Sequence, residues 1–92
     1  MESLFRKKVN ISVQKRNGRK MITIVTGIDD DIDLPRVLSH MKKNFSCNGS
    51  VKKSKKNDEF YIQLSGDKKD EVYDFLVSHE IADDENIIFH GI

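Results

Sequence analysis

The pair Asn17-Gly18 limits the fold of this chain more than any other feature, because Asn-Gly is the preferred pair for a two-residue hairpin turn. Both central residues of that type I′ turn need positive φ, which Asn and Gly adopt readily. Apolar and polar residues alternate on both sides of the pair, over residues 9–14 and 21–25. The turn then pairs Arg16 with Arg19, Val13 with Ile22 and Ile11 with Ile24. This register puts the aliphatic residues of both strands on one face, and a one-residue slip would lose the match.

A first amphipathic helix is predicted to follow the hairpin. Gly27 ends the second strand, and Asp33 is suited to cap the helix, with Pro35 tolerated in its first turn. Apolar residues then recur at spacings of three and four: Leu34, Val37, Leu38, Met41 and Phe45. Lys42 and Lys43 fall outside this stripe and should face solvent.

A second hairpin and a second helix are predicted in the remaining chain. One arm begins at Ser50 to Lys52, the other runs from Phe60 to Leu64, and a polar, basic connection joins them. Asp67 and Asp70 occupy the cap and N3 positions of a box-like helix start, and residues 87–90 form a last short strand. The inner face of this helix is marked by Val72, Phe75 and Leu76.

The order β-β-α-β-β-α-β predicts an α+β fold. We expect an open two-layer sandwich, with a mainly antiparallel sheet and two helices on one face. Residues 1–8 are expected to form a short flexible tail, and residues 9–92 the single domain.

Composition argues against several classes of function. One cysteine, Cys47, cannot form an internal disulfide, and neither it nor the three histidines have the spacing of a metal site or a catalytic triad. The longest purely apolar run, residues 87–89, is far shorter than the roughly 20 residues that cross a bilayer. We therefore expect a cytoplasmic, monomeric protein that is not an enzyme and uses no metal, cofactor or membrane.

Charge is divided sharply along the chain, although the net charge is only +1. Residues 1–57 carry 14 Lys or Arg and 5 Asp or Glu, for a net charge of +9. Residues 58–92 carry 2 and 10, for a net charge of −8. The basic half favours polyphosphate partners, whereas the acidic half would repel nucleic acid and could meet basic protein surfaces.

An ordered set of motifs resembles the eukaryotic translation initiation factor 1 family over residues 9–92. The most specific part is the run from Gln14 to Lys20, which contains Arg16-Asn17-Gly18-Arg19-Lys20. Further matching segments follow in the expected order: Thr23, Val25, Gly27-Ile28, Asp30, Asp33, Lys42-Lys43, Phe45 to Val51, Ile62 to Asp67, Phe75-Leu76 and His90-Gly91-Ile92.

The resemblance implies a non-enzymatic factor that binds the small ribosomal subunit near the P site. Such a factor promotes scanning and start-codon fidelity, and leaves when a correct codon is recognised. Small-subunit RNA would contact Arg16, Asn17, Gly18, Arg19, Lys20, Lys42 and Lys43. Lys53, Ser54, Lys55, Lys56 and Asn57 would lie near the initiator tRNA and resist its full docking. Other initiation factors of the preinitiation complex would be further partners.

Physical chemistry supports charge and shape as the basis of RNA recognition. Cations on a stiff turn lose little freedom when they bind phosphate. Single-strand readers stack bases on exposed aromatic rings, but this chain has no Trp and most of its Phe are predicted to face the core. Because the second loop is basic, any hindrance of tRNA there must be steric.

Other interpretations of these segments remain open. The cations of either loop could be solvated turn residues, and Lys42 and Lys43 could simply favour a helix C-terminus. Asp29, Asp31 and Asp33 have the first spacings of an EF-hand loop, but Leu34 and His40 stand where Gly and Glu are needed. The chain could also be a protein-interaction module or a generic RNA-binding module of the same fold.

Overall fold

A computed structural model describes residues 8–29, 31–56 and 58–90 of the chain. Its elements follow the predicted order: β1 (Val9–Arg16), β2 (Lys20–Thr26), α1 (Leu34–Phe45), β3 (Gly49–Lys53), β4 (Phe60–Ser65), α2 (Lys69–Ser78) and β5 (Ile87–His90). One turn of 3-10 helix, η2 (Asp84–Asn86), precedes β5. Residues 1–7 of the tail expected at residues 1–8 lie outside the described residues, and Lys8 is exposed.

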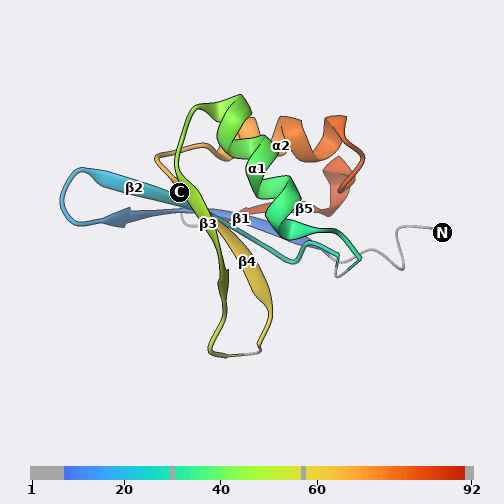
Figure 1. The fold of residues 1–92 in the computed structure, drawn as a ribbon, viewed down its shortest axis with the longest axis horizontal. Coiled ribbons are helices and arrows are strands. Elements are labelled where there is room, and N and C mark those ends of the chain that lie inside the picture. Colours follow the sequence, from blue (N-terminus) through green and yellow to red (C-terminus); the bar gives the residue numbers. More distant parts are fainter. Residues whose placement is uncertain (1–7, 30, 57, 91–92) are drawn as a thin grey trace.

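The five strands form one sheet in the order β3-β4-β2-β1-β5. All neighbours are antiparallel except β1 and β5, which run parallel. Both helices cover the same face of the sheet, and the two hairpins extend beyond the helices in different directions (Figure 1). The predicted α+β class and two-layer architecture are therefore confirmed.

The core lies between the sheet and the helices. Its most deeply buried side chains are Val9, Ile11, Val25, Met41, Ile62, Leu64, Val72 and Leu76. Phe45 contributes an edge-on ring contact with Phe75, with centroids 5.9 Å apart. In the described part of the chain, neither helix is both long and apolar enough to cross a membrane.

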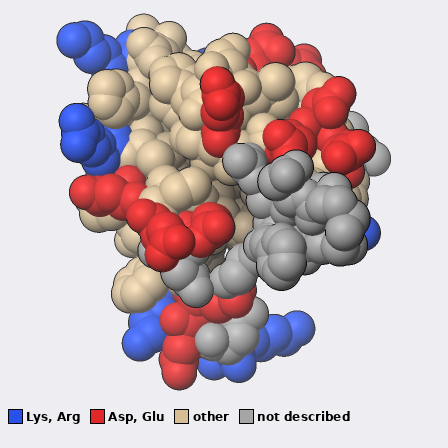
Figure 2. Space-filling view, turned by 90° about the vertical axis from the view of Figure 1, so that its right-hand side faces the viewer, with Lys and Arg blue, Asp and Glu red and all other residues tan. Residues whose placement is uncertain are grey.

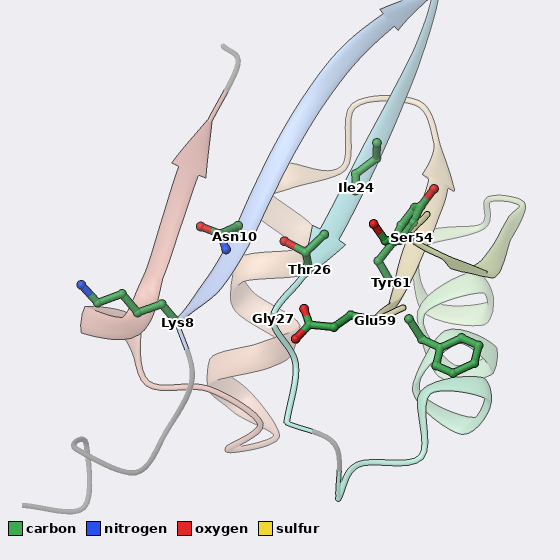
Figure 3. Close-up of a pocket in the computed structure, with 9 residues that line it drawn as sticks. Lys8, Asn10, Ile24, Thr26, Gly27, Ser54, Glu59 and Tyr61 are labelled. Atoms are coloured by element: carbon green, nitrogen blue, oxygen red, sulfur yellow. The ribbon is translucent and has the colours of Figure 1, made fainter. Parts of the chain in front are cut away.

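The predicted register of the first hairpin is wrong by one residue. Arg16 pairs with Lys20, Val13 with Thr23 and Ile11 with Val25, so the loop contains Asn17, Gly18 and Arg19. Thr23 and Val25 consequently face the helices, and Ile22 and Ile24 lie on the outer face, where they are half-buried. Figure 3 shows Ile24 on that face beside Asn10 and Thr26, with the helices behind the sheet.

Hydrogen bonds explain how a threonine replaces an isoleucine in the core. Thr23 is fully buried, and its hydroxyl donates to the Gly66 carbonyl at 2.7 Å and accepts from the Lys68 N–H at 2.8 Å. A buried hydroxyl with both bonds made loses little relative to water. Both faces of residues 21–26 carry apolar side chains, so alternation alone fits either register. The shifted register also lets Met21 and Thr23 of β2 form hydrogen bonds with the turn before α2.

The helix starts were predicted with unequal success. Asp33 caps α1 as expected, because its side chain accepts from the Arg36 N–H at 3.3 Å. The predicted box at the second helix is wrong, since the cap residue is Lys68 and it makes no side-chain cap bond. Asp67 lies one residue too early, and its Oδ1 accepts from the Lys69 N–H at 3.4 Å instead.

The described Phe side chains fall on core-facing positions as expected, but two of the four are exposed. Phe75 is buried and Phe45 half-buried, but Phe60 is 56% exposed and Phe89 is 42% exposed. Phe60 alternates correctly with Ile62 and Leu64, yet it lies where β4 has passed beyond the helices (Figure 1). Period-2 alternation identifies a face of a strand but not where the opposite layer ends.

Candidate nucleic-acid interface

The tip of the first hairpin presents its cations on an ordered turn. Asn17 has φ 46° and Gly18 has φ 69°, and the Lys20 N–H donates to the Asn17 carbonyl at 3.4 Å. Arg16 and Arg19 flank these residues, and all five side chains or backbone positions from 16 to 20 are exposed. The structure thus brings together the five residues that were predicted from this motif.

A groove of about 710 Å³ runs from this tip to the end of β4. Four tip residues, Arg16, Asn17, Arg19 and Lys20, line it on one side. The other walls are Met21, Ile22, Gln63, Ser65, Gly66 and Asp67. We call this surface the tip groove. Its β4 side was not predicted as part of the site, because only the antiparallel pairing of β2 with β4 brings residues 63–67 to the tip.

Hydrogen bonds hold the two sides of the tip groove together. The Gly66 N–H donates to the Met21 carbonyl at 2.7 Å, and the Thr23 hydroxyl bonds to the same turn. The turn at residues 65–68 is therefore attached to β2 at two levels. Arg19 and Lys20 consequently project from the start of a strand that pairs with β1 on one side and is hydrogen-bonded to this turn on the other.

The carboxylate in the tip groove is partly neutralised by its own neighbour. Lys69 Nζ lies 2.9 Å from Asp67 Oδ2 and 3.2 Å from Oδ1. The side-chain hydrogen bond from Lys69, with smaller contributions from nearby charge, holds the pKa of Asp67 below its usual value. The groove therefore keeps a net positive charge, which suits phosphate.

Lys42 and Lys43 lie in the last turn of α1 and are both exposed. The helix is capped by Ser46, which has φ 52°, and the Cys47 N–H donates to the Lys42 carbonyl at 3.2 Å. This end of α1 points toward the side of the molecule from which the β1–β2 hairpin extends (Figure 1). The two lysines are on that side, but they belong to the helix layer and the tip groove belongs to the sheet.

The tip of the second hairpin is a tight, bonded turn. The Ser54 N–H donates to the Glu59 carbonyl at 2.7 Å, and the Asp58 N–H donates to the Ser54 carbonyl at 3.1 Å. Lys53 lies near Asp58, with Nζ and Oδ1 3.9 Å apart, and Lys53, Lys55 and Lys56 are all exposed. Asn57, the last residue predicted for this loop, lies outside the described residues. The predicted RNA contacts at residues 16–20 and the predicted tRNA-proximal loop are therefore at separate hairpin tips (Figure 1).

Among residues 8–29, 31–56 and 58–90, no three His, Cys, Asp or Glu side chains are placed to hold a metal ion. Cys47 is half-buried, and burial, only partly offset by Lys68 and Lys42, raises the pKa of its thiol. A thiol with a raised pKa is a poor nucleophile near neutral pH.

The fold is a small two-layer sandwich that presents exposed cations on a braced hairpin. The sequence model of the family "Translation initiation factor SUI1" matches residues 6–82. The chain belongs to this family, which is a class of non-enzymatic translation initiation factors.

Curated relatives are similar over most of their length. The chain is 41% identical to eukaryotic translation initiation factor eIF-1 of Saccharomyces cerevisiae over 83 residues, covering 90% of this chain and 76% of that protein. It is also 41% identical to human eukaryotic translation initiation factor 1, covering 90% and 73%. A translation factor SUI1 homologue of Acanthamoeba polyphaga mimivirus is 38% identical, covering 91% and 79%.

A solved structure with a similar fold is the C-terminal domain of human eIF2D, with a TM-score of 0.75 and 15% identity. The match covers 87% of this chain and 41% of that one. At this identity the likeness concerns the fold alone.

Proposed function

We propose that this protein binds the small ribosomal subunit near the P site, with the tip groove against ribosomal RNA. The observation that carries the proposal is the braced cationic turn at Arg16, Asn17, Gly18, Arg19 and Lys20. Bonds within the turn reduce the freedom its backbone would lose on binding, so more of the phosphate attraction remains as affinity. Family membership supports a partner in the translation machinery, and the cytoplasm is where that machinery works.

Recognition in this proposal depends on phosphate and shape. The tip groove is lined by guanidinium, ammonium, amide and hydroxyl groups, by two apolar side chains and by the Asp67 carboxylate, without an aromatic ring. Arginine can bind phosphate through two parallel N–H groups, and the side-chain amides of Asn17 and Gln63 can reach sugar or phosphate oxygens. A folded RNA surface supplies such groups at fixed spacing, whereas a single strand would need a base-stacking platform.

Lys42 and Lys43 extend the proposed contact to the helix layer. Both are exposed at the end of α1 on the side of the first hairpin, so a large RNA surface could meet the tip and the helix end together. A lysine that is stabilised by a helix C-terminus is still charged and can also bind phosphate.

The second hairpin supplies the proposed gate. Ser54, Lys55 and Lys56 lie at the tip of a bonded turn that extends away from the sandwich. Lys53 and Asn57 are their neighbours in the sequence. Placed beside the initiator tRNA, this tip would obstruct full docking by its volume, while its cations would attract tRNA phosphate. Correct codon pairing would then stabilise the docked tRNA and release the protein, so scanning continues until that event.

The central experiment measures binding of labelled protein to isolated small subunits as a function of salt. Arg16→Ala/Arg19→Ala/Lys20→Ala should weaken binding and reduce the slope of log K against log salt by about two to three, as expected for three lost phosphate contacts. The double variant Lys8→Ala/Arg36→Ala removes exposed cations outside the tip groove and should change the slope little. Equal slopes for the triple variant and the unmodified protein would refute the proposal.

Gating is tested separately on small subunits that carry initiator tRNA and either a correct or a near-cognate start codon. The protein should dissociate faster from the correct complex. Lys55→Gly/Lys56→Gly, which removes volume at the second tip, should reduce this difference while leaving binding to empty subunits nearly unchanged. Identical dissociation from both complexes would contradict the release mechanism but leave ribosome binding intact.

A generic RNA-binding module is the second candidate function. The exposed cations of both tips favour it, because non-specific binding needs only charge. It predicts that an unrelated structured RNA of similar size competes as well as the small subunit does.

A further inference from the structure

An apolar groove rimmed by carboxylates lies at the start of α1, on the side away from the first hairpin tip. Its volume is about 620 Å³, within the range of about 300 to 1,000 Å³ that is common for ligand clefts. Apolar walls are supplied by Ile28, Ile32, Leu34, Pro35, Val51 and Phe60. Carboxylates are supplied by Asp29, Asp33 and Asp58, and Glu59 also lines the groove although its carboxylate points toward Thr26 and Gly27 (Figure 3). We call this surface the acid-rimmed groove.

Phe60 is the most exposed large apolar side chain in the described part of the chain, at 56%. Lys53 Nζ lies 5.8 Å from the centroid of its ring, so a cation already occupies part of the ring surface. Ile32, Leu34 and Val51 are only half-buried around the same groove. A ring exposed at the edge of a groove is the kind of residue that anchors protein contacts.

The charge around the groove is strongly negative. Asp29 accepts one bond from the Asp31 N–H at 3.1 Å, and Asp33 accepts one from the Arg36 N–H at 3.3 Å. Each of these carboxylates has a second oxygen with further acceptor capacity. Lys53 is a cation beside the rim, and its contact with Asp58 is long, at 3.9 Å between exposed side chains.

Folding joins carboxylates from both halves of the sequence on this side. Asp29 and Asp33 come from the basic half, and Asp58 begins the acidic half. Figure 2 views the molecule from the right-hand side of Figure 1 and shows Asp and Glu side chains gathered over this face, with Lys and Arg toward its margins. A phosphate backbone would be repelled here, whereas a cationic peptide would be attracted.

We propose that the acid-rimmed groove binds a basic, amphipathic segment of a partner protein. One apolar side chain of the segment would lie against Phe60, Ile32 and Val51, and flanking Lys or Arg would pair with Asp29 and Asp58. This goes beyond the proposed ribosome contact. The groove and the first hairpin tip lie on different sides of the molecule, so both can be occupied at once (Figure 1).

The test uses a fluorescein-labelled peptide of 14 residues. Leu recurs in it at spacings of three and four, and all remaining positions are Lys or Gln. Two matched peptides replace every Lys by Glu or every Leu by Ser. Binding is measured by anisotropy and mapped by amide shifts in ¹H–¹⁵N NMR spectra. The basic amphipathic peptide should bind and shift residues 28–34, 51 and 58–60, and both matched peptides should bind at least tenfold more weakly.

Matched protein variants assign the contact to the groove. Phe60→Ala should weaken peptide binding at least about fivefold, the loss for an interface residue that contributes significantly to binding, whereas Phe89→Ala removes another exposed ring and should change it less than twofold. Asp29→Asn/Asp58→Asn should also weaken binding, because the amide oxygen keeps the local turn bond but not the charge. Asp84→Asn, in η2 and not among the residues that line the groove, serves as its control.

Several results would overturn the proposal. These are failure of the basic peptide to bind at millimolar concentration, equal binding of the Glu peptide, and shifts centred on residues 83–85. Equal effects of Phe60→Ala and Phe89→Ala would have the same force. Concentration-dependent shifts at the groove without peptide would also overturn it, because a second copy of the chain would then be the occupant. The same shifts with an RNA oligonucleotide would overturn it as well.

Discussion

Replacing Thr23 by valine tests the observed register of the first hairpin directly. Valine has nearly the same shape, but it cannot donate to the Gly66 carbonyl or accept from the Lys68 N–H. A buried polar group left without its partner costs about 1 to 3 kcal/mol, and two groups lose a partner here. Because the turn that carries them is only partly buried, we expect Thr23→Val to lower the free energy of unfolding by about 2 to 4 kcal/mol.

Urea unfolding followed by circular dichroism measures this loss. With a slope near the low end of the usual range, about 1 kcal/mol per molar, the midpoint should fall by about 2 M or more. Thr26→Val is the matched control, since Thr26 is half-buried on the outer face of the same strand. It should change stability by less than about 0.5 kcal/mol.

The register predicted from Asn17-Gly18 would give the opposite ranking. Thr23 would then face solvent, its replacement would be nearly neutral, and the side chain of Ile24 would be in the core. Equal midpoints for Thr23→Val and Thr26→Val would therefore refute the register and the bracing of the tip groove.

Three further outcomes are expected. Gly27→Ala should lower the free energy of unfolding in urea by about 2 to 4 kcal/mol, because Gly27 has φ 85° and an added Cβ would meet the Lys8 carbonyl. Gly18→Ala has open space for the Cβ and should cost about 1 kcal/mol. Similar losses for both variants would contradict the close approach at Gly27. The pKa of Asp67 is lowered in the folded state, so its small stabilising effect is present above about pH 4 and is lost as the pH falls through the folded value. The stability difference between the unmodified protein and Asp67→Asn should accordingly shrink between pH 4 and pH 2 in acid titrations, and a constant difference would argue against it. Burial and the raised pKa of Cys47 predict alkylation by iodoacetamide at pH 8 that is slower than for glutathione and accelerates in urea, and fast alkylation of the folded protein would contradict this.

Elements and layers were predictable because local signals agreed with one another. Asp33 and the apolar stripe from Leu34 to Phe45 specify α1, and its cap is confirmed by the hydrogen bond to Arg36. The alternation of Ile62 with Leu64 specifies an inner face for β4, and both are fully buried. Each of these signals depends on residues within one turn or one strand.

Long-range pairing supplied what local signals could not. Residues 21–25 alternate acceptably in either register, and the choice depends on Gly66 and Lys68, which are more than 40 positions away. The wall of the tip groove formed by residues 63–67 has the same origin in the pairing of β2 with β4. Only the basic side of the candidate site, Arg16 to Lys20, was readable from a contiguous motif, and its contact with RNA is still a prediction.

The parallel pairing of β5 with β1 has a consequence for how the molecule forms. Val9 lies opposite Ile87, so the sheet reaches its full width only after residue 87 has left the exit tunnel. Closing such a long loop is entropically unfavourable and slows folding relative to local hairpins. Until then β1 has an unpaired edge, and the nascent chain can form its two hairpins and α1 but not the finished domain.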